Sequence, residues 1–179
     1  MESKEYLIEL LKEKYHYELG RKDKFEDNLS LPVTVLGLII AGLFYVINEV
    51  YSDTLSRCSK AIFIGMIGSM LIIIIGAILS LVYVFFGFKR EYCTFPESKA
   101  ILERYEEIKV YSEKHKEDDS FITSSLKKDT IKWYSDCNEN NMRTNDRRAN
   151  AFHTFKMLFS IIIILGVLLM FLVFYLKVN

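Results

Sequence analysis

Residues 61–88 read AIFIGMIGSMLIIIIGAILSLVYVFFGF, a run of 28 residues without one charged side chain. An α-helix of that length extends about 42 Å, whereas the hydrocarbon core of a bilayer is about 30 Å thick. Two more apolar runs predict membrane-crossing helices over 31–50 and 156–177. The sequence therefore predicts an all-α membrane protein with three transmembrane helices.

Small residues recur along the second span at spacings of 4, 7, 4 and 7, which places them within an arc of about 60° on a helix. They are Gly65, Ser69, Gly76, Ser80 and Gly87. Small residues let another helix approach closely, which matters in lipid because close van der Waals contact holds helices together there. The stripe is either a helix-packing seam or the wall of a pore in an oligomer.

The first span has a matching face of small and polar residues, which predicts a tight hairpin with the second span. This face comprises Thr34, Gly37, Ala41 and Asn48. The connection between the spans is short, and Glu49 and Asp53 stand at its outer edge. These two carboxylates either ring the outer mouth of an oligomeric pore and favour cations, or are simply solvated at the interface.

The distribution of positive charge predicts the orientation in the membrane. The first 30 residues hold six Lys and Arg residues, residues 89–156 hold fourteen, and only Arg57, Lys60 and Lys177 lie elsewhere. By the positive-inside rule, the N-terminus and the 89–155 region are cytoplasmic, and the C-terminus is outside. We therefore expect a multi-pass protein of the cell inner membrane, and the formal net charge of zero argues against a general nucleic-acid binder.

Outside the spans the sequence predicts helices. Residues 1–29 contain an amphipathic helix for which Gly20 is a plausible stop. Within 89–155, Thr94 and Glu97 read as a capping box that starts a helix ending near Lys116, and a second helix begins near Phe121. These two helices form an α-hairpin stalk under the membrane.

An asparagine-rich stretch precedes the third span. Asparagine disfavours helix interiors, which predicts a break. On a continuous helix, however, one face carries Tyr134, Asn138, Asn141, Asn145, Arg148, Phe152 and Phe159. That alignment favours an unbroken helix into the third span, with the polar ladder fixing the register between like helices of an oligomer.

Cationic and aromatic residues near the inner end of the third span make a candidate anion site, in which Arg forks would pair with phosphates and aromatic rings would stack on bases. Its residues are Trp133, Tyr134, Asn141, Arg143, Asn145, Arg147, Arg148 and Lys156. A nucleotide or short oligonucleotide is the ligand class that such a site fits. The alternative is that these cations set the topology and extend to lipid phosphates.

Several classes of function are not expected. The interiors of the spans carry no charged residue, which argues against an ion-coupled transporter. No catalytic, phosphate-loop or metal-ligand motif is recognisable, so we expect no enzyme, no catalytic residue, no metal site and no resident cofactor. Cys58, Cys93 and Cys137 show neither a zinc-site nor a disulfide-framework spacing, and packed or interfacial thiols are expected.

The whole layout resembles small membrane effectors of bacterial anti-phage defence, namely SLATT-type effectors and the channel-forming partners of nucleotidyltransferases in Hailong, CBASS and Pycsar systems. The nearest motif is Asn141, Asn145 and Arg148, and SLATT-type proteins have two spans where this chain has three. The resemblance implies oligomerisation, control by a nucleotide signal or a partner protein such as a nucleotidyltransferase acting through its product, and membrane depolarisation.

The function expected is therefore a homo-oligomeric channel or pore in the lipid bilayer, gated by rearrangement of the cytoplasmic helices. Two alternatives remain. One is a membrane-anchored scaffold whose α-hairpin recruits a soluble partner, and the other is a holin-like lesion former.

Overall fold

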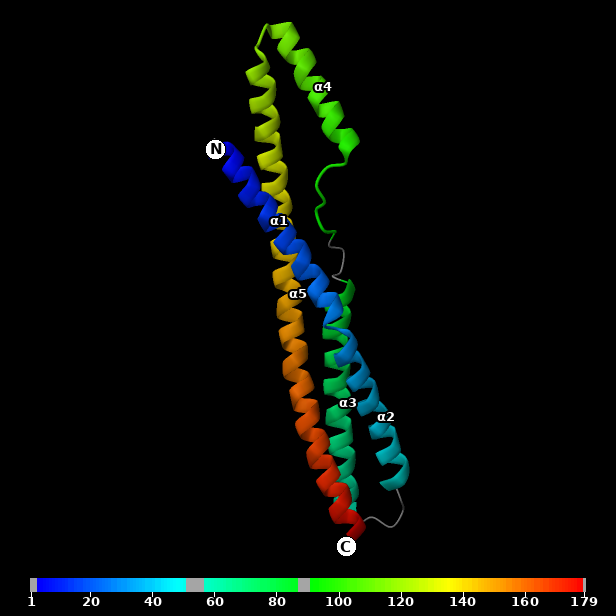
Figure 1. Cartoon of the computed structure of the whole chain (residues 1–179). Helices are drawn as coiled ribbons and strands as arrows, with labels where there is room; N and C mark the ends of the chain where they lie inside the picture. Colours follow the sequence, from blue (N-terminus) through cyan, green and yellow to red (C-terminus); the bar gives the residue numbers. More distant parts are fainter. Residues whose placement is uncertain (1–2, 51–56, 87–90, 179) are drawn as a thin grey trace. The chain divides into compact units, whose positions relative to one another are not determined.

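The computed structural model describes residues 3–50, 57–86 and 91–178, and these contain helices and connecting segments but no strand (Figure 1). The helices are α1 (Ser3–Asp27), α2 (Ser30–Val50), α3 (Arg57–Phe86), α4 (Ser98–His115) and α5 (Asp119–Val178). The chain divides into two units. The charged unit comprises Met1–Asp23 and Lys89–Asp146, and the apolar unit comprises Lys24–Phe88 and Arg147–Asn179.

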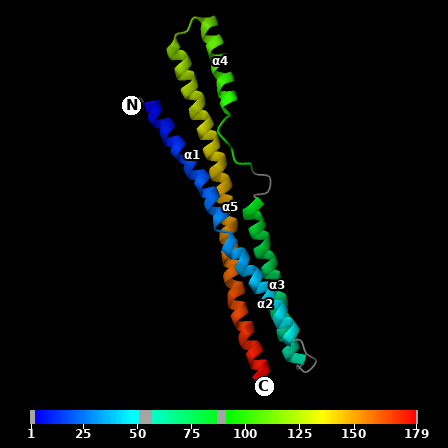
Figure 2. The same ribbon diagram turned by 45° about the vertical axis from the view of Figure 1, so that its right-hand side comes forward.

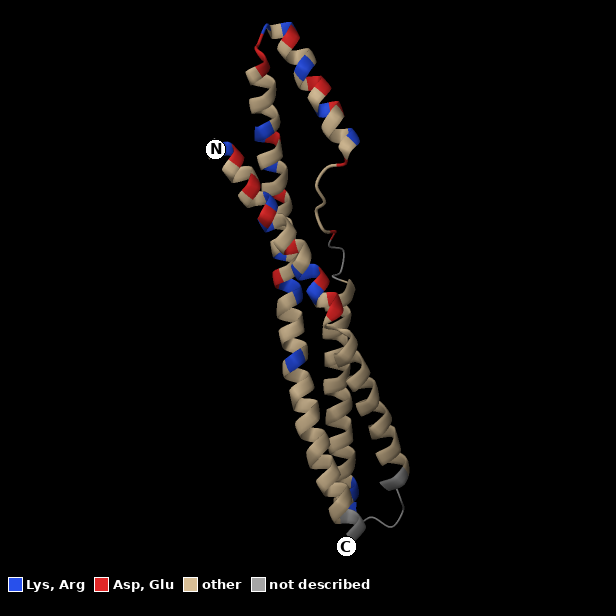
Figure 3. Ribbon diagram, in the orientation of Figure 1, with Lys and Arg blue, Asp and Glu red and all other residues tan. Residues whose placement is uncertain are grey.

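Among the residues that the structure describes, three helices are long and apolar enough to cross a membrane. This confirms the prediction of an all-helical protein and is consistent with a multi-pass membrane protein. These helices belong to the stretches 3–48, which contains both α1 and α2, 57–86 and 119–175. Charged side chains are concentrated elsewhere, so residues 30–48 of α2, 61–86 of α3 and 157–176 of α5 form long uncharged stretches (Figure 3).

The apolar unit packs α2, α3 and the end of α5 together through large side chains at heptad spacing. The buried residues of α3 are spaced alternately 4 and 3 apart, and they are Phe63, Ile67, Met70, Ile74, Ala77, Leu81 and Val84. Buried positions also recur every seven residues in α5, at Phe155, Ile162 and Leu169, and around α2, at Leu29 just before the helix and at Leu36 and Leu43 within it. This spacing keeps one face of each helix toward its neighbours, as in left-handed coiled coils.

The small-residue faces are not the seam inside this chain, so the prediction that they pair the first two spans is wrong. On α2, Thr34, Gly37, Ala41 and Asn48 are all exposed. On α3, Gly65 and Ser69 are exposed and Gly76 and Ser80 are half-buried, whereas Gly87 lies outside the described residues. The physical reason is that the opposite faces carry Phe, Ile, Leu and Met, whose larger side chains make more dispersion contacts per helix pair.

Helix α5 is a single helix of 60 residues that passes through the asparagine-rich stretch without a break, as the alignment of its polar residues predicted (Figure 2). The position of its buried residues explains why. Tyr134, Asn138, Asn141, Asn145 and Arg148 follow one another at spacings of 4, 3, 4 and 3 and are all buried, so they share one face. Asparagine is tolerated because these side chains bond to other segments rather than to their own helix.

Two of the predicted helix ends in the charged unit are wrong. Helix α1 continues through Gly20 to Asp27. Helix α4 begins at Ser98 with Glu97 as its N-cap residue, and no side chain caps it. The capping box at Thr94 does not form because Cys93 and Phe95, on either side of Thr94, make their backbone hydrogen bonds elsewhere in the charged unit.

Helix α4 ends at His115, close to the predicted end near Lys116, and a tight turn leads from it into α5. Lys116 closes α4 in the left-handed conformation (φ 58°), and its N–H lies against the carbonyl oxygens of the last turn. Asp118 then caps α5, since its Oδ1 accepts hydrogen bonds from the Phe121 N–H (3.1 Å) and the Ser120 hydroxyl (2.7 Å). These hydrogen bonds lower the pKa of the Asp118 carboxyl group, and the bond from the Ser120 hydroxyl is the largest cause.

Candidate functional site: an asparagine clamp on a disulfide-linked segment

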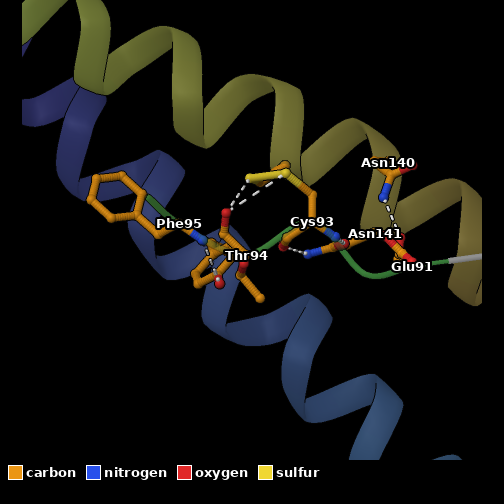
Figure 4. The surroundings of a disulfide bond; sticks show 8 residues. Glu91, Cys93, Thr94, Phe95, Asn140 and Asn141 are labelled. Atoms are coloured by element: carbon orange, nitrogen blue, oxygen red, sulfur yellow. Dashed lines mark hydrogen bonds between the residues drawn. A yellow bond between two sulfur atoms is a disulfide. The ribbon is translucent and has the colours of Figure 1, made fainter. Parts of the chain in front are cut away.

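The extended segment 91–97 lies along α5 in the charged unit and is held there by asparagine side chains (Figure 4). Asn141 accepts a hydrogen bond from the Cys93 N–H at Oδ1 (2.8 Å) and donates from Nδ2 to the Cys93 carbonyl oxygen (3.0 Å). Asn140 donates to the Glu91 carbonyl oxygen (3.0 Å). Because a carboxamide carries one acceptor and one donor group, it pairs with an extended backbone much as a neighbouring strand would.

A disulfide joins the same segment to the same helix. It links Cys93 to Cys137, whose Cα atoms are 4.8 Å apart, and Cys58 is free and exposed. The interpretation of all three cysteines as packed or interfacial thiols is therefore wrong for this pair. Cys137 lies one helical turn before Asn141, so the disulfide and the Asn141 hydrogen bonds hold Cys93 from adjacent positions on one face of α5 (Figure 4).

We call Asn140 and Asn141, together with the segment 91–97 that they bind, the asparagine clamp. Aromatic side chains also pack against this segment. Phe95 stacks on Tyr134 with ring centroids 4.4 Å apart, and its edge contact with Trp133 has a centroid distance of 5.8 Å. The Phe95 N–H donates to the Tyr15 hydroxyl on α1 (3.2 Å). Trp133 and Tyr134, the rings that we expected to stack on bases, thus contact a side chain of the clamped segment.

Asn145 anchors α1 to α5 in the charged unit. It is fully buried, donates from Nδ2 to the Glu18 carbonyl oxygen and to Glu18 Oε2 (both 2.8 Å), and accepts from the Tyr92 hydroxyl (2.6 Å). The buried Glu18 carboxylate also pairs with Arg21 (3.0 Å), which in turn pairs with Asp146 (2.9 Å). A buried carboxylate is tolerated only when it is paired and hydrogen-bonded, and both conditions hold here.

Asn138 is the one buried asparagine that is incompletely satisfied. Its Nδ2 donates to the Leu11 carbonyl oxygen (2.9 Å). Its Oδ1 is, among the described residues, the buried side-chain polar atom that lacks a hydrogen-bond partner. Asparagines 138, 140, 141 and 145 therefore each bind the backbone of another segment of the same chain. The polar ladder, which we expected to fix the register between helices of an oligomer, joins segments of one chain instead.

Arg148 plays the corresponding part in the apolar unit. Its Nε donates to the Val84 carbonyl oxygen (2.8 Å), which belongs to the last turn of α3, where carbonyl groups have no partner within the helix. Its guanidinium lies 3.6 Å from a Glu26 carboxylate oxygen and 5.5 Å from the centre of the Phe25 ring. A buried cation at a helix C-terminus is favoured both by these partners and by the helix dipole.

The predicted anion-site residues do not share one open surface. Tyr134, Asn141, Asn145 and Arg148 are buried, and each contacts protein groups. Arg143, Arg147 and Lys156 are exposed. Arg143 pairs with Glu139 (2.5 Å), and the Lys156 Nζ lies 4.9 Å from the centre of the Phe152 ring. At the predicted outer mouth, Glu49 belongs to the last turn of α2, while Asp53 lies outside the described residues.

Sequence reasoning found the asparagines and Arg148 but missed their partners, which are segment 91–97, Leu11, Glu18 and Val84. The sequence signal that could have indicated this site is the spacing of Cys137, Asn141 and Asn145, one helical turn apart. It gives no indication of the partners, which are remote in sequence.

Within the described ranges no three His, Cys, Asp or Glu side chains are grouped as a metal ion would require. Neither a family model, a curated protein nor a solved structure matches this chain.

Proposed function

We propose that this protein assembles into a homo-oligomer in the cell inner membrane and forms a channel or pore there, in the manner of a bacterial anti-phage effector. The observation that supports the proposal is that the small face of α2 and the Gly65–Ser69 part of the α3 stripe are exposed, while large side chains fill the core of the apolar unit. A Cβ added at Gly37 or Gly65 would meet no atom within 4 Å.

Outward small faces favour a second copy as the occupant. In lipid, helices associate through close van der Waals contact, which glycine permits. Within the described part of the apolar unit, no other helix makes such a contact at Gly37 or Gly65. The Thr34 and Ser69 hydroxyls donate to carbonyl oxygens of their own helices (3.0 and 2.8 Å). Both hydroxyls keep acceptor lone pairs, so the same faces also suit the wall of a water-filled pore.

The asparagine clamp is the element we assign to gating. Segment 91–97 begins five residues after α3 ends at Phe86, and it is held to α5 by separate hydrogen bonds that a ligand or partner could exchange. Gating would be a population shift between a clamped and a released state, driven by whatever binds one state better. By the resemblance to effector systems, that signal is a nucleotide made by a nucleotidyltransferase.

Substitution of Gly65 by leucine tests the proposal. The structure leaves open space at Gly65, so the monomer should fold, whereas leucine would separate two copies packed on this face. Gly76→Leu is less informative, because a Cβ there would lie 3.3 Å from Leu158 Cδ1 within the chain. As a control, Ile164→Phe adds bulk to an exposed position of α5. Loss of the oligomer and of conductance in Gly65→Leu alone is expected; a Gly65→Leu oligomer that conducts like the wild type would overturn the proposal.

A scaffold is the second candidate, and outward apolar residues on α4 favour it. Leu102 and Val110 are 61% and 63% exposed on a helix outside the spans, where a soluble partner could cover them. Replacing the three spans with an unrelated membrane anchor separates the candidates, since a scaffold keeps its activity and a channel loses it. Dye release with a broad size cut-off would instead indicate a holin-like lesion.

A further inference from the structure

The Cys93–Cys137 disulfide lies in the part of the chain that carries most of the positive charge. Residues 89–156 hold fourteen of the 23 Lys and Arg residues, which by the positive-inside rule places this region in the cytoplasm. Thiols there are kept reduced, and disulfides that do form are usually transient, catalytic or redox-sensing. We propose that Cys93–Cys137 is a reversible redox switch that fastens segment 91–97 to α5.

The sulfur atoms of Cys93 and Cys137 are unequally accessible, and this difference determines which of them reacts first. Cys93 is half-buried and Cys137 is buried, so a small-molecule disulfide such as oxidised glutathione meets Cys93 first. The Cys93 thiolate attacks that disulfide and releases one glutathione thiol, which leaves a mixed disulfide on Cys93. The Cys137 thiolate then attacks the Cys93 sulfur and releases the second glutathione thiol. The protein loses two electrons and two protons, and one oxidised glutathione becomes two thiols.

Asn141 couples the redox state to the clamp. Its two hydrogen bonds to the Cys93 backbone fix Cys93 opposite Cys137, so they raise the effective concentration of one thiol beside the other. The linkage is reciprocal: whatever stabilises the clamped segment stabilises the disulfide, and the disulfide stabilises the clamped segment. Reduction removes the covalent link and leaves the segment held by hydrogen bonds and by the Phe95 stacking alone.

This switch rests on the predicted orientation and on the clamp, and not on conduction. A failed channel test therefore leaves the thiol measurements interpretable. If the channel proposal holds, the redox state would be one of the inputs that set the population of the clamped state.

The orientation is tested in intact cells that express the full chain. In a Cys137→Ser variant, which frees Cys93, a membrane-impermeant maleimide should label Cys58 and spare Cys93, while a permeant maleimide should label both. Cys58, which is exposed and predicted to lie outside, is the internal control. Labelling of Cys93 by the impermeant reagent would overturn the proposal, because the disulfide would then lie in an oxidising compartment where it needs no switching role.

The redox equilibrium is tested with the purified full chain in lipid nanodiscs, equilibrated with reduced and oxidised glutathione and quenched with a maleimide that shifts the protein on a gel. We expect Cys93 and Cys137 to convert together within the glutathione ratios of a reducing cytoplasm. The switch would be overturned if the disulfide persisted at every glutathione ratio, or if both cysteines stayed reduced in oxidised glutathione alone.

Three asparagine variants test the coupling. Asn141→Ala should favour reduction by about tenfold because two hydrogen bonds to the clamped form are lost, and Asn140→Ala should favour it by about threefold because one is lost. Asn150→Ala, an exposed position on the same helix, should leave the equilibrium unchanged. Circular dichroism checks that each variant keeps its helical content. If Asn141→Ala does not fold, the milder Asn140→Ala tests the coupling in its place. Equal equilibria in all three variants would refute the coupling.

Discussion

Replacing Asn145 with leucine should be among the most destabilising single changes in the charged unit. The substitution keeps the approximate size of the side chain but removes three hydrogen bonds, two donated to Glu18 and one accepted from the Tyr92 hydroxyl. The bond to the Glu18 carboxylate contributes about 2 kcal/mol and the two neutral bonds about 1 kcal/mol each. Burial of the leucine side chain recovers about 1 kcal/mol, so the expected loss is about 3 kcal/mol.

The assay is equilibrium unfolding of the full chain in mixed micelles, read by circular dichroism, with hydrogen exchange of segment 91–97 as a local probe. Exchange in that segment should speed up, because Tyr92 loses its acceptor. Asn150→Leu is the matched control, since it makes the same change at an exposed position of α5 and should change stability by no more than about 0.5 kcal/mol.

A double-mutant cycle isolates the contact with the carboxylate. In a Glu18→Gln background the acceptor is neutral, so Asn145→Leu should cost about 1 kcal/mol less than in the wild type. A loss below about 1 kcal/mol for Asn145→Leu, or the same loss in both backgrounds, would refute the reasoning, because a fully buried asparagine with these partners could not then be anchoring α1 to α5.

Three further predictions concern other parts of the fold. Arg148→Lys keeps the charge but loses the Nε donor to the Val84 carbonyl oxygen, and should lower the free energy of unfolding by about 1–3 kcal/mol in micelles; an unchanged value would contradict the capping role. Ile162→Ala, at a fully buried position, should cost about 2–3 kcal/mol through the cavity it leaves, whereas Ile164→Ala, at an exposed position, should cost little; equal costs would disprove the heptad core. The carboxyl group of Asp118 should titrate, by NMR, below its ordinary pKa, so its stabilising effect is present above the unfolded pKa and is lost as the pH falls through the folded pKa; a pKa at or above the ordinary value would contradict the cap.

Hydropathy and periodicity were sufficient to predict the helical content and the spans. A run of 28 uncharged residues leaves little choice but a membrane helix, and the alignment of Asn141, Asn145 and Arg148 was enough to predict that α5 is unbroken. Both inferences depend on local order along one helix, which is information that a single sequence carries directly.

The inner faces of the spans could not be chosen in the same way. In a soluble protein the polar side of a helix faces water, but both sides of α3 are apolar, so hydropathy does not distinguish the Phe63–Met70 face from the Gly65–Ser69 face. The disulfide and the asparagine partners were missed for a different reason. They join residues 44 or more positions apart, and only the fold brings those residues together.

The most direct test of the proposed function is single-channel recording from the purified oligomer in planar bilayers, with the clamp both closed and released by Asn141→Ala under reducing conditions. The proposal predicts discrete conductance steps whose reversal potential follows the cation gradient, and more frequent opening when the clamp is released. A silent bilayer with both proteins, at matched and verified incorporation, would contradict a clamp-gated pore.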